Sequence, residues 1–116
     1  MGHQAELAGQ LRVTVEFTST TTRSPTITWS PADAIAARSR FEYARIFLVA
    51  PGDPQRTYLD IVDGKPSATV RLPDTVPPGE YVIEVDAYGS ASWGDGRLEA
   101  RGRSAPFPIG DTGPAL

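Results

Sequence analysis

The sequence contains no cysteine and no asparagine, and it has one histidine and one lysine. Without cysteine there is no disulfide, no thiolate nucleophile and no sulfur ligand for a metal. Without asparagine there is no N-glycosylation sequon. His3, the only histidine, falls in the first ten residues, outside the region that we expect to fold, which leaves no histidine for a nucleophile-base pair or a multi-histidine metal site. We therefore expect no enzyme activity, no metal and no cofactor.

Long apolar runs and a large excess of one charge are missing too. No stretch of 18 apolar residues occurs, so we expect no membrane insertion. Residues 1–10 lack the basic start and apolar stretch of a secretion signal. The formal net charge of -3 gives no overall attraction to nucleic acid, so no nucleic-acid partner is expected.

The composition that remains is that of one globular domain. The chain has 116 residues, of which 40% are hydrophobic, a length that supports one core rather than two. Glycine and proline, with 11 residues each, indicate many turns. We expect an N-terminal arm at 1–10, a domain at 11–109 and a C-terminal tail at 110–116.

Apolar residues recur with a period of two, which is typical of half-buried strands. Residues 32–40 alone have helical character; their four alanines and Asp33, a possible cap, predict a single turn or a long loop carrying Arg38 and Arg40. The alternation and the turn residues predict strands at 11–17, 25–29, 41–50, 57–62, 67–72, 80–88 and 104–109, the last as an edge strand, and residues 97–103 could continue the hairpin that 80–88 begins. Seven short alternating segments indicate an all-β fold, a seven-stranded antiparallel β-sandwich.

Four segments carry a resemblance to the fibronectin type III and related immunoglobulin-like domains. "TITWSP" resembles the second strand of that family, with Trp29 as the core tryptophan, and "FEYARIFLV" places Tyr43 where the third strand often has an aromatic residue. "PPGEYVIEVDAYG" is similar to the sixth strand, with Tyr81 as the tyrosine-corner residue, and "GRSAPFPI" to the start of the last one. Bacterial immunoglobulin-like domains with a Pro-Gly-x-Tyr turn match the corner equally well. The resemblance implies a non-catalytic spacer, adhesion or docking module.

Most aromatic residues lie on apolar phases of the predicted strands. We expect core positions for Phe17, Trp29, Phe41, Tyr43 and Tyr81. Trp93 differs because it lies between Ser92 and a Gly-Asp-Gly segment, in a loop where it could anchor an interface, stack on a sugar ring or fold back over the end of the sandwich.

The sequence offers one carboxylate pair for chemistry. Glu84 and Asp86 share a face of one predicted strand, at about the 7 Å spacing of strand residues i and i+2. That spacing is near the separations used in glycoside hydrolysis. Alternating acidic residues are more typical of the solvated outer face of a sandwich, which is the interpretation that we prefer. The aspartates at turns are explained by turn chemistry rather than by a calcium site.

The remaining candidates for function are contact residues. Arg101 and Arg103 share a strand face with Arg97, where they could meet an acidic partner or protect a solvated strand edge, the interpretation that we favour. Tyr58 and Tyr88 could extend a surface at Trp93 if the loops converge. The candidate interaction residues are Tyr58, Tyr88, Trp93, Arg38, Arg40, Arg97 and Arg101.

Two functions fit this sequence. The first is a structural or interaction module, a subunit of a phage virion, tail or surface structure that binds other protein subunits, including copies of itself, through loops, edges and termini. The second is an extracellular carbohydrate- or ligand-binding module that uses Trp93. Both place the chain on a virion or at an extracellular surface.

Overall fold

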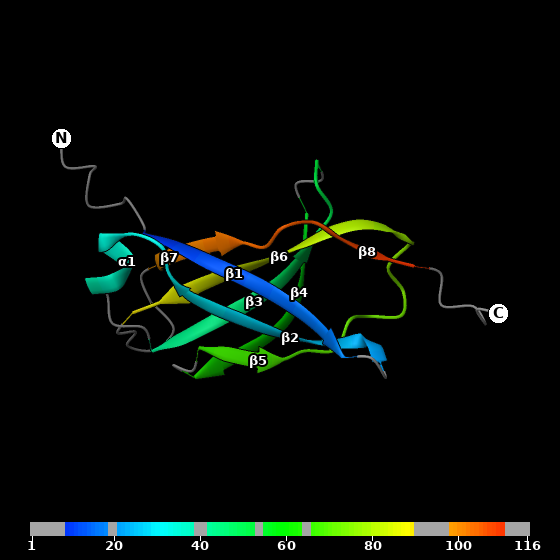
Figure 1. Ribbon diagram of the computed structural model, residues 1–116, viewed down its shortest axis with the longest axis horizontal. Coiled ribbons are helices and arrows are strands. Elements are labelled where there is room, and N and C mark those ends of the chain that lie inside the picture. The colour runs from blue at the N-terminus through cyan, green and yellow to red at the C-terminus, as the bar shows by residue number, and fades with distance from the viewer. Residues whose placement is uncertain are drawn as a thin grey trace.

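The computed structural model describes residues 9–18, 21–38, 42–52, 55–63, 66–89 and 98–110. Strands dominate it, as the period of two predicted. Its elements are β1 (Gly9–Thr18), β2 (Thr21–Pro31), α1 (Ala34–Arg38), β3 (Tyr43–Val49), β4 (Arg56–Asp63), β5 (Ser67–Thr69), β6 (Gly79–Tyr88), β7 (Leu98–Arg103) and β8 (Phe107–Ile109) (Figure 1).

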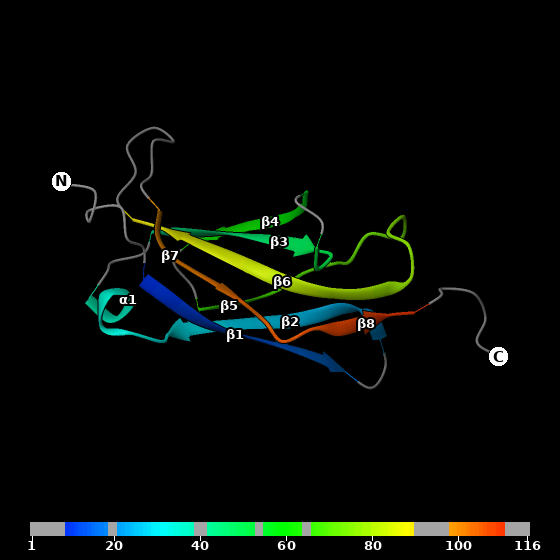
Figure 2. The same cartoon turned by 90° about the horizontal axis from the view of Figure 1, so that it is seen from above.

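The strands form two layers with the core between them. One sheet has the order β4-β3-β6-β7 and the other has the order β1-β2-β5 (Figure 2). We call the first the front sheet and the second the back sheet, although β1 and β2 lie nearer the viewer in Figure 1. A short parallel pairing of Gly9 and Gln10 with Ala100 and Arg101 joins β1 to β7, so the two layers form one continuous strand order. β8 pairs with the start of β6. The predicted β-sandwich is confirmed, with eight strands instead of seven and with one parallel pairing.

The core is filled by alternate residues of both sheets. Trp29 is 4% exposed and Ile27 is fully buried on β2, while Ile83 and Val85 are fully buried on β6. Tyr81 is buried as well, and its hydroxyl donates a 2.6 Å hydrogen bond to the carbonyl of Pro77, four residues earlier. This is the tyrosine corner that the resemblance implied, and it fixes the turn leading into β6.

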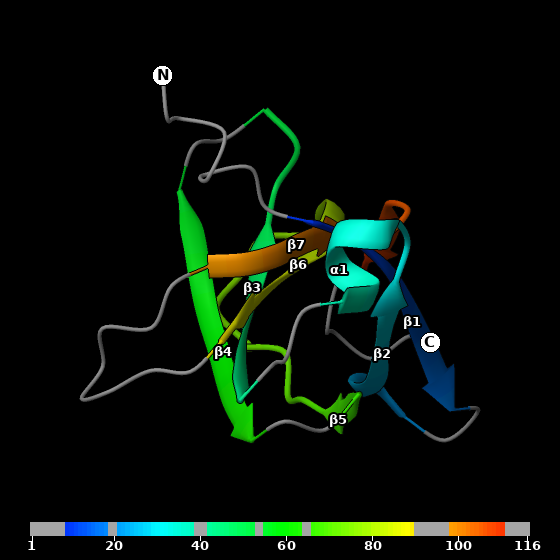
Figure 3. The ribbon, with the colours of Figure 1, turned by 90° about the vertical axis from the view of Figure 1, so that its left-hand side faces the viewer.

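The start of β1 passes closely between α1 and β7. A Cβ atom at Gly9 would fall on the backbone of Ala36 in α1, and one at Gly102 would fall on the backbone of Leu11. Asp33 fixes the crossing because its carboxylate accepts from the backbone N–H of Ala36 at 2.9 Å and from that of Gln10 at 3.1 Å. The predicted cap of a single helical turn is confirmed, and α1 lies beside the end of the sandwich (Figure 3).

Two of the aromatic core assignments are wrong. Phe17 is 36% exposed and lies near the end of β1, where the register with β2 shifts between Glu16 and Thr18; its ring packs against Phe107 at a centroid distance of 5.6 Å. Tyr43 is half-buried and lies on the outer face of the front sheet, since the inward residues of β3 are Ala44, Ile46 and Leu48. Phe41 lies outside the described residues.

We expect Gly102→Ala to lower the free energy of unfolding by about 2 to 3 kcal/mol, because the new methyl group must displace the β1 backbone. Urea denaturation measures the change. Gly110→Ala is the matched control, since a Cβ there meets nothing within 4 Å, and it should stay within about 0.5 kcal/mol of the parent. Equal stability of the two variants would show that β1 does not cross at Gly102.

Candidate functional site

The outer face of the front sheet, the side turned away from the core, is built from four cross-strand rows. The registers of β3 with β4 and with β6, and of β6 with β7, place residues of three or four strands side by side in each row. From β4 to β7, the second row is Tyr58, Phe47, Glu84 and Arg103, and the third is Ile61, Arg45, Asp86 and Arg101. The first row is Arg56, Val49 and Val82, and the fourth is Asp63, Tyr43, Tyr88 and Leu98. The β4–β3 half of this face is therefore mainly apolar and aromatic, and the two middle rows of the β6–β7 half are ionic.

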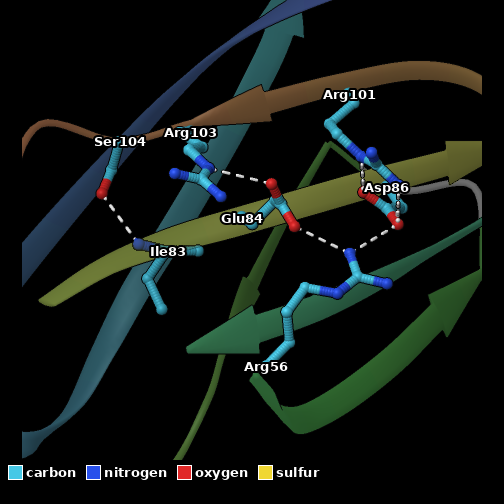
Figure 4. Close-up of polar contacts among 7 residues, drawn as sticks. All are labelled: Arg56, Ile83, Glu84, Asp86, Arg101, Arg103 and Ser104. Atoms are coloured by element: carbon cyan, nitrogen blue, oxygen red, sulfur yellow. Dashed lines mark hydrogen bonds and ion pairs between the residues drawn. The ribbon is translucent and has the colours of Figure 1, made fainter. Parts of the chain in front are cut away.

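Glu84 and Asp86 are buried at the centre of this face. Asp86 has no exposed side-chain surface and receives a forked pair of hydrogen bonds from Arg101, Nε to Oδ1 at 2.7 Å and Nη2 to Oδ2 at 2.9 Å (Figure 4). Glu84 accepts from Nε of Arg103 at 2.9 Å. This geometry is the strong, bidentate or charge-assisted form of carboxylate recognition.

Arg56 joins the two carboxylates from the opposite side. Its Nη1 donates to Oε1 of Glu84 at 2.7 Å and to Oδ2 of Asp86 at 2.9 Å, although Arg56 belongs to the first row (Figure 4). Its guanidinium carbon lies 3.8 Å from the centroid of the Phe47 ring. The aromatic ring thus supports the guanidinium through a cation–π contact while its nitrogens bridge the two anions. We call the residues Arg56, Glu84, Asp86, Arg101 and Arg103 the ionic cluster.

An aromatic pair lies beside the ionic cluster at the end of β3. The rings of Tyr43 and Tyr88 are stacked with 5.0 Å between centroids and 7° between planes. The guanidinium carbon of Arg45 is 5.8 Å from the Tyr43 ring and 5.3 Å from that of Tyr88. Burial raises the pKa of the Tyr88 hydroxyl, and the negative charge of Asp86 raises it further. Tyr88 therefore stays neutral over the physiological pH range.

The ionic cluster is unsuited to acid-base catalysis. Burial alone would raise the pKa of Asp86, but the hydrogen bonds from Arg101 and then Arg56 outweigh it and hold the pKa below its ordinary value. A general acid needs the opposite shift, toward the working pH. Both oxygens of each carboxylate are already held by guanidinium groups. The arrangement holds fixed charge instead of transferring protons.

The preferred interpretation of Glu84 and Asp86 as solvated residues is wrong. They do share a strand face, as expected, but their side chains are 5% and 0% exposed because three arginines cover them. Arg101 and Arg103 are partly exposed, as expected, but the edge part of their interpretation is wrong because β7 lies between β6 and the start of β1.

The other predicted contact residues are separated in the structure. Tyr58 and Tyr88 lie on the same outer face, but in different rows, with Tyr58 against Phe47 and Tyr88 against Tyr43. Those two β3 residues are four positions apart, which is about 13 Å along a strand. Arg38 ends α1, and its side chain lies outside the described part of the structure, as do Arg40, Trp93 and Arg97 as whole residues.

Sequence reasoning missed Arg56, Arg45 and Phe47 as residues of this face. Their roles depend on the order β4-β3-β6, which joins segments far apart in the chain. The contacts between β6 and β7 could have been predicted from the sequence. An antiparallel hairpin that pairs Asp86 with Arg101 also pairs Glu84 with Arg103, which places two acidic residues opposite two basic ones.

The described residues hold no group of three or more His, Cys, Asp or Glu side chains that could bind a metal ion. No helix in the described part of the chain has the length and apolarity that crossing a membrane requires.

Comparison with known proteins supports the fold. No family model and no curated protein matches the sequence. Among solved structures, the chain is similar to titin kinase with its flanking domains (TM-score 0.59, 18% identity, 90% of this chain and 17% of that one). It is also similar to titin domains A168–A170 (TM-score 0.58, 18% identity, 90% of this chain and 33% of that one). The fold is of the immunoglobulin and fibronectin type III kind.

The chain is also similar in structure to part of a protein other than titin. Pectate lyase PelI from Erwinia chrysanthemi, in complex with tetragalacturonic acid, matches with a TM-score of 0.52 and 12% identity over 85% of this chain and 28% of that one. The chain thus spans at most a third of each of these three proteins. At these identities the likeness concerns the fold alone.

We expect Asp86→Asn to lower the free energy of unfolding at neutral pH by about 2 to 3 kcal/mol. Breaking a fully buried ion pair costs about 3 to 5 kcal/mol, and the loss is smaller here because the partly exposed Arg56 and Arg101 can be hydrated instead. Urea denaturation measures it. Asp63→Asn, at an exposed carboxylate on the same face, is the control and should change stability by less than about 0.5 kcal/mol.

The contribution of Asp86 also depends on pH. Its pKa is lower in the folded than in the unfolded chain, so the unfolded chain takes up the proton first as pH falls. The stabilisation is complete above the unfolded pKa of about 4 and is lost as pH falls through the folded one. The stability difference between the parent and Asp86→Asn should therefore shrink at about pH 3. A difference that grows on acidification would contradict the ion pairing.

Proposed function

We propose that this chain is a non-catalytic protein-interaction module that contacts neighbouring subunits of a larger assembly through the outer face of the front sheet. The observation that carries the proposal is the ionic cluster at the centre of that face. It fixes three strands by hydrogen bonds from both sides and gives a rigid surface rich in arginine and aromatic side chains. Arginine and aromatic residues are enriched at protein interfaces and at their energetic centres.

Exposed apolar side chains favour the same face. The described residues leave four large hydrophobic side chains exposed, and two of them, Tyr58 at 54% and Ile61 at 45%, lie together on the β4 side of this face. They continue into the buried patch of Phe47, Val49 and Val82. Exposed apolar side chains next to arginine and aromatic residues have the composition that protein interfaces favour.

The finer expectations stay predictions. A phage virion, tail or surface structure is one assembly that such a module could serve, and copies of the chain are among its possible neighbours. The carbohydrate-binding alternative depends on Trp93, which lies outside the described residues. It predicts saturable glycan binding that Trp93→Ala abolishes.

Site-specific photo-crosslinking tests the proposal. A photoreactive benzoyl-phenylalanine replaces Tyr58 in the native cells, and in a control it replaces Ser30, an exposed residue of the back sheet. We expect a discrete adduct from position 58 alone, with the partner peptide identified by mass spectrometry as a copy of this chain or another subunit. A second change, Ile61→Asp, should remove the adduct because it places a charge in the apolar patch. Equal adducts from both positions, or none from position 58, would refute the proposal.

A further inference from the structure

The ionic cluster has its anions inside and its cations outside. The side chains of Glu84 and Asp86 are 5% and 0% exposed, whereas those of Arg56, Arg101 and Arg103 are 32%, 45% and 54% exposed. An approaching molecule therefore meets guanidinium groups, and the carboxylates that balance them are covered. Three guanidinium groups also exceed two carboxylates by one charge. This part of the surface presents positive charge although the chain as a whole has a formal charge of -3.

A groove lies next to the two more exposed arginines. It has a volume of about 500 Å³ and runs between the start of β1 and the outward side chains of β7. The β1 side is formed by Gly9, Gln10 and Leu11, and the front-sheet side by Glu84, Leu98, Arg101, Gly102 and Arg103. The only formal charges in this lining are two arginines and the buried Glu84.

The arginines of this groove keep donors for a second partner. Arg103 uses its Nε for Glu84, and among the described residues no hydrogen bond is made by its two terminal nitrogens. Arg101 uses Nε and Nη2 for Asp86. Guanidinium groups that are already held by a buried carboxylate lose little side-chain freedom when they bind a second anion. The ionic cluster thus preorganises Arg101 and Arg103 for anion binding.

We propose that the groove between β1 and β7 binds a carboxylate-bearing segment of a protein partner, with Arg103 and Arg101 as the contact residues. The inference rests on the proposed function, since it names the chemistry of the partner that the same face would meet. A protein segment suits the size of the groove, which holds a few side chains, and guanidinium forks match carboxylates in geometry. The net negative charge of the chain disfavours a nucleic acid, whose many phosphates would be repelled.

The test is a titration of the ¹⁵N-labelled full chain, followed by NMR. The probe is an acetylated decapeptide of alternating Glu and Ala, and the control peptide has Gln in place of Glu. We expect saturable shifts at Gln10, Leu98, Arg101 and Arg103 with the Glu peptide alone. Arg103→Gln should weaken binding by about three- to fivefold, the range for a partly exposed ion pair.

Two further variants separate the groove from general electrostatics. Gln10→Glu adds a carboxylate to the groove without changing any arginine, and it should weaken binding by a similar factor of about three to five. Arg71→Gln removes an exposed arginine that does not line the groove and should leave the affinity unchanged. Circular dichroism of each variant checks that the fold is retained. Equal losses in Arg103→Gln and Arg71→Gln would overturn the inference.

Titrations with two other anions test whether the groove selects a protein carboxylate. Inorganic phosphate and a sulfated heparin octasaccharide are titrated in the same way. Binding of either one in the groove, with no binding of the Glu peptide, would overturn the assignment to a protein carboxylate. If no probe binds while the adduct from position 58 persists, this inference fails and the proposed function stands. If the Glu peptide binds but position 58 gives no adduct, the inference about the groove stands and the proposed wider interface fails.

Discussion

The neutralisation of two buried carboxylates is the constraint on which the front sheet depends. Asp86 and Glu84 sit on the central strand β6, where an unpaired charge would be strongly unfavourable. Arginines from β7 on one side and from β4 on the other supply the balancing positive charge, and the side chain of Arg56 extends across β3 to reach both carboxylates. Strands that are distant in sequence are thereby fixed in one register. The stability of the sheet and the shape of its outer face therefore have a common origin.

The same arrangement connects structure to function. Because the carboxylates are covered and the guanidinium groups are partly exposed, the cluster stabilises the sheet while it presents positive charge to solvent. The apolar β4 side, with Tyr58 and Ile61, lies across the same face. A rigid surface of this kind needs no rearrangement to bind a partner, which reduces the entropic penalty of association. In the proposed function, the fold and the binding surface are thus parts of one network rather than a scaffold with separate loops.

Alternation of apolar residues and the turn signals predicted the sandwich and the Trp29 core, and the resemblance to fibronectin type III domains implied the tyrosine corner at Tyr81, because all three depend on local pattern. The same pattern could not assign faces on central strands, where both phases are apolar, and this explains the error at Tyr43. The burial of Asp86 was missed because alternation shows which residues share a face and not what covers that face. The register of the β6–β7 hairpin could have predicted the pairing of Asp86 with Arg101. The contact with Arg56 could not be predicted in this way, because it depends on the order of strands in the folded sheet.

The most direct test of this account is an NMR spectrum of the arginine Nε–Hε groups at neutral pH. The structure predicts two protected, slowly exchanging signals, because Nε of Arg101 and of Arg103 each donate to a covered carboxylate. Asp86→Asn should remove protection from Arg101 and leave Arg103 protected, and Glu84→Gln should do the reverse. Rapid exchange of both signals in the parent chain would contradict the ionic cluster and with it the proposed binding face.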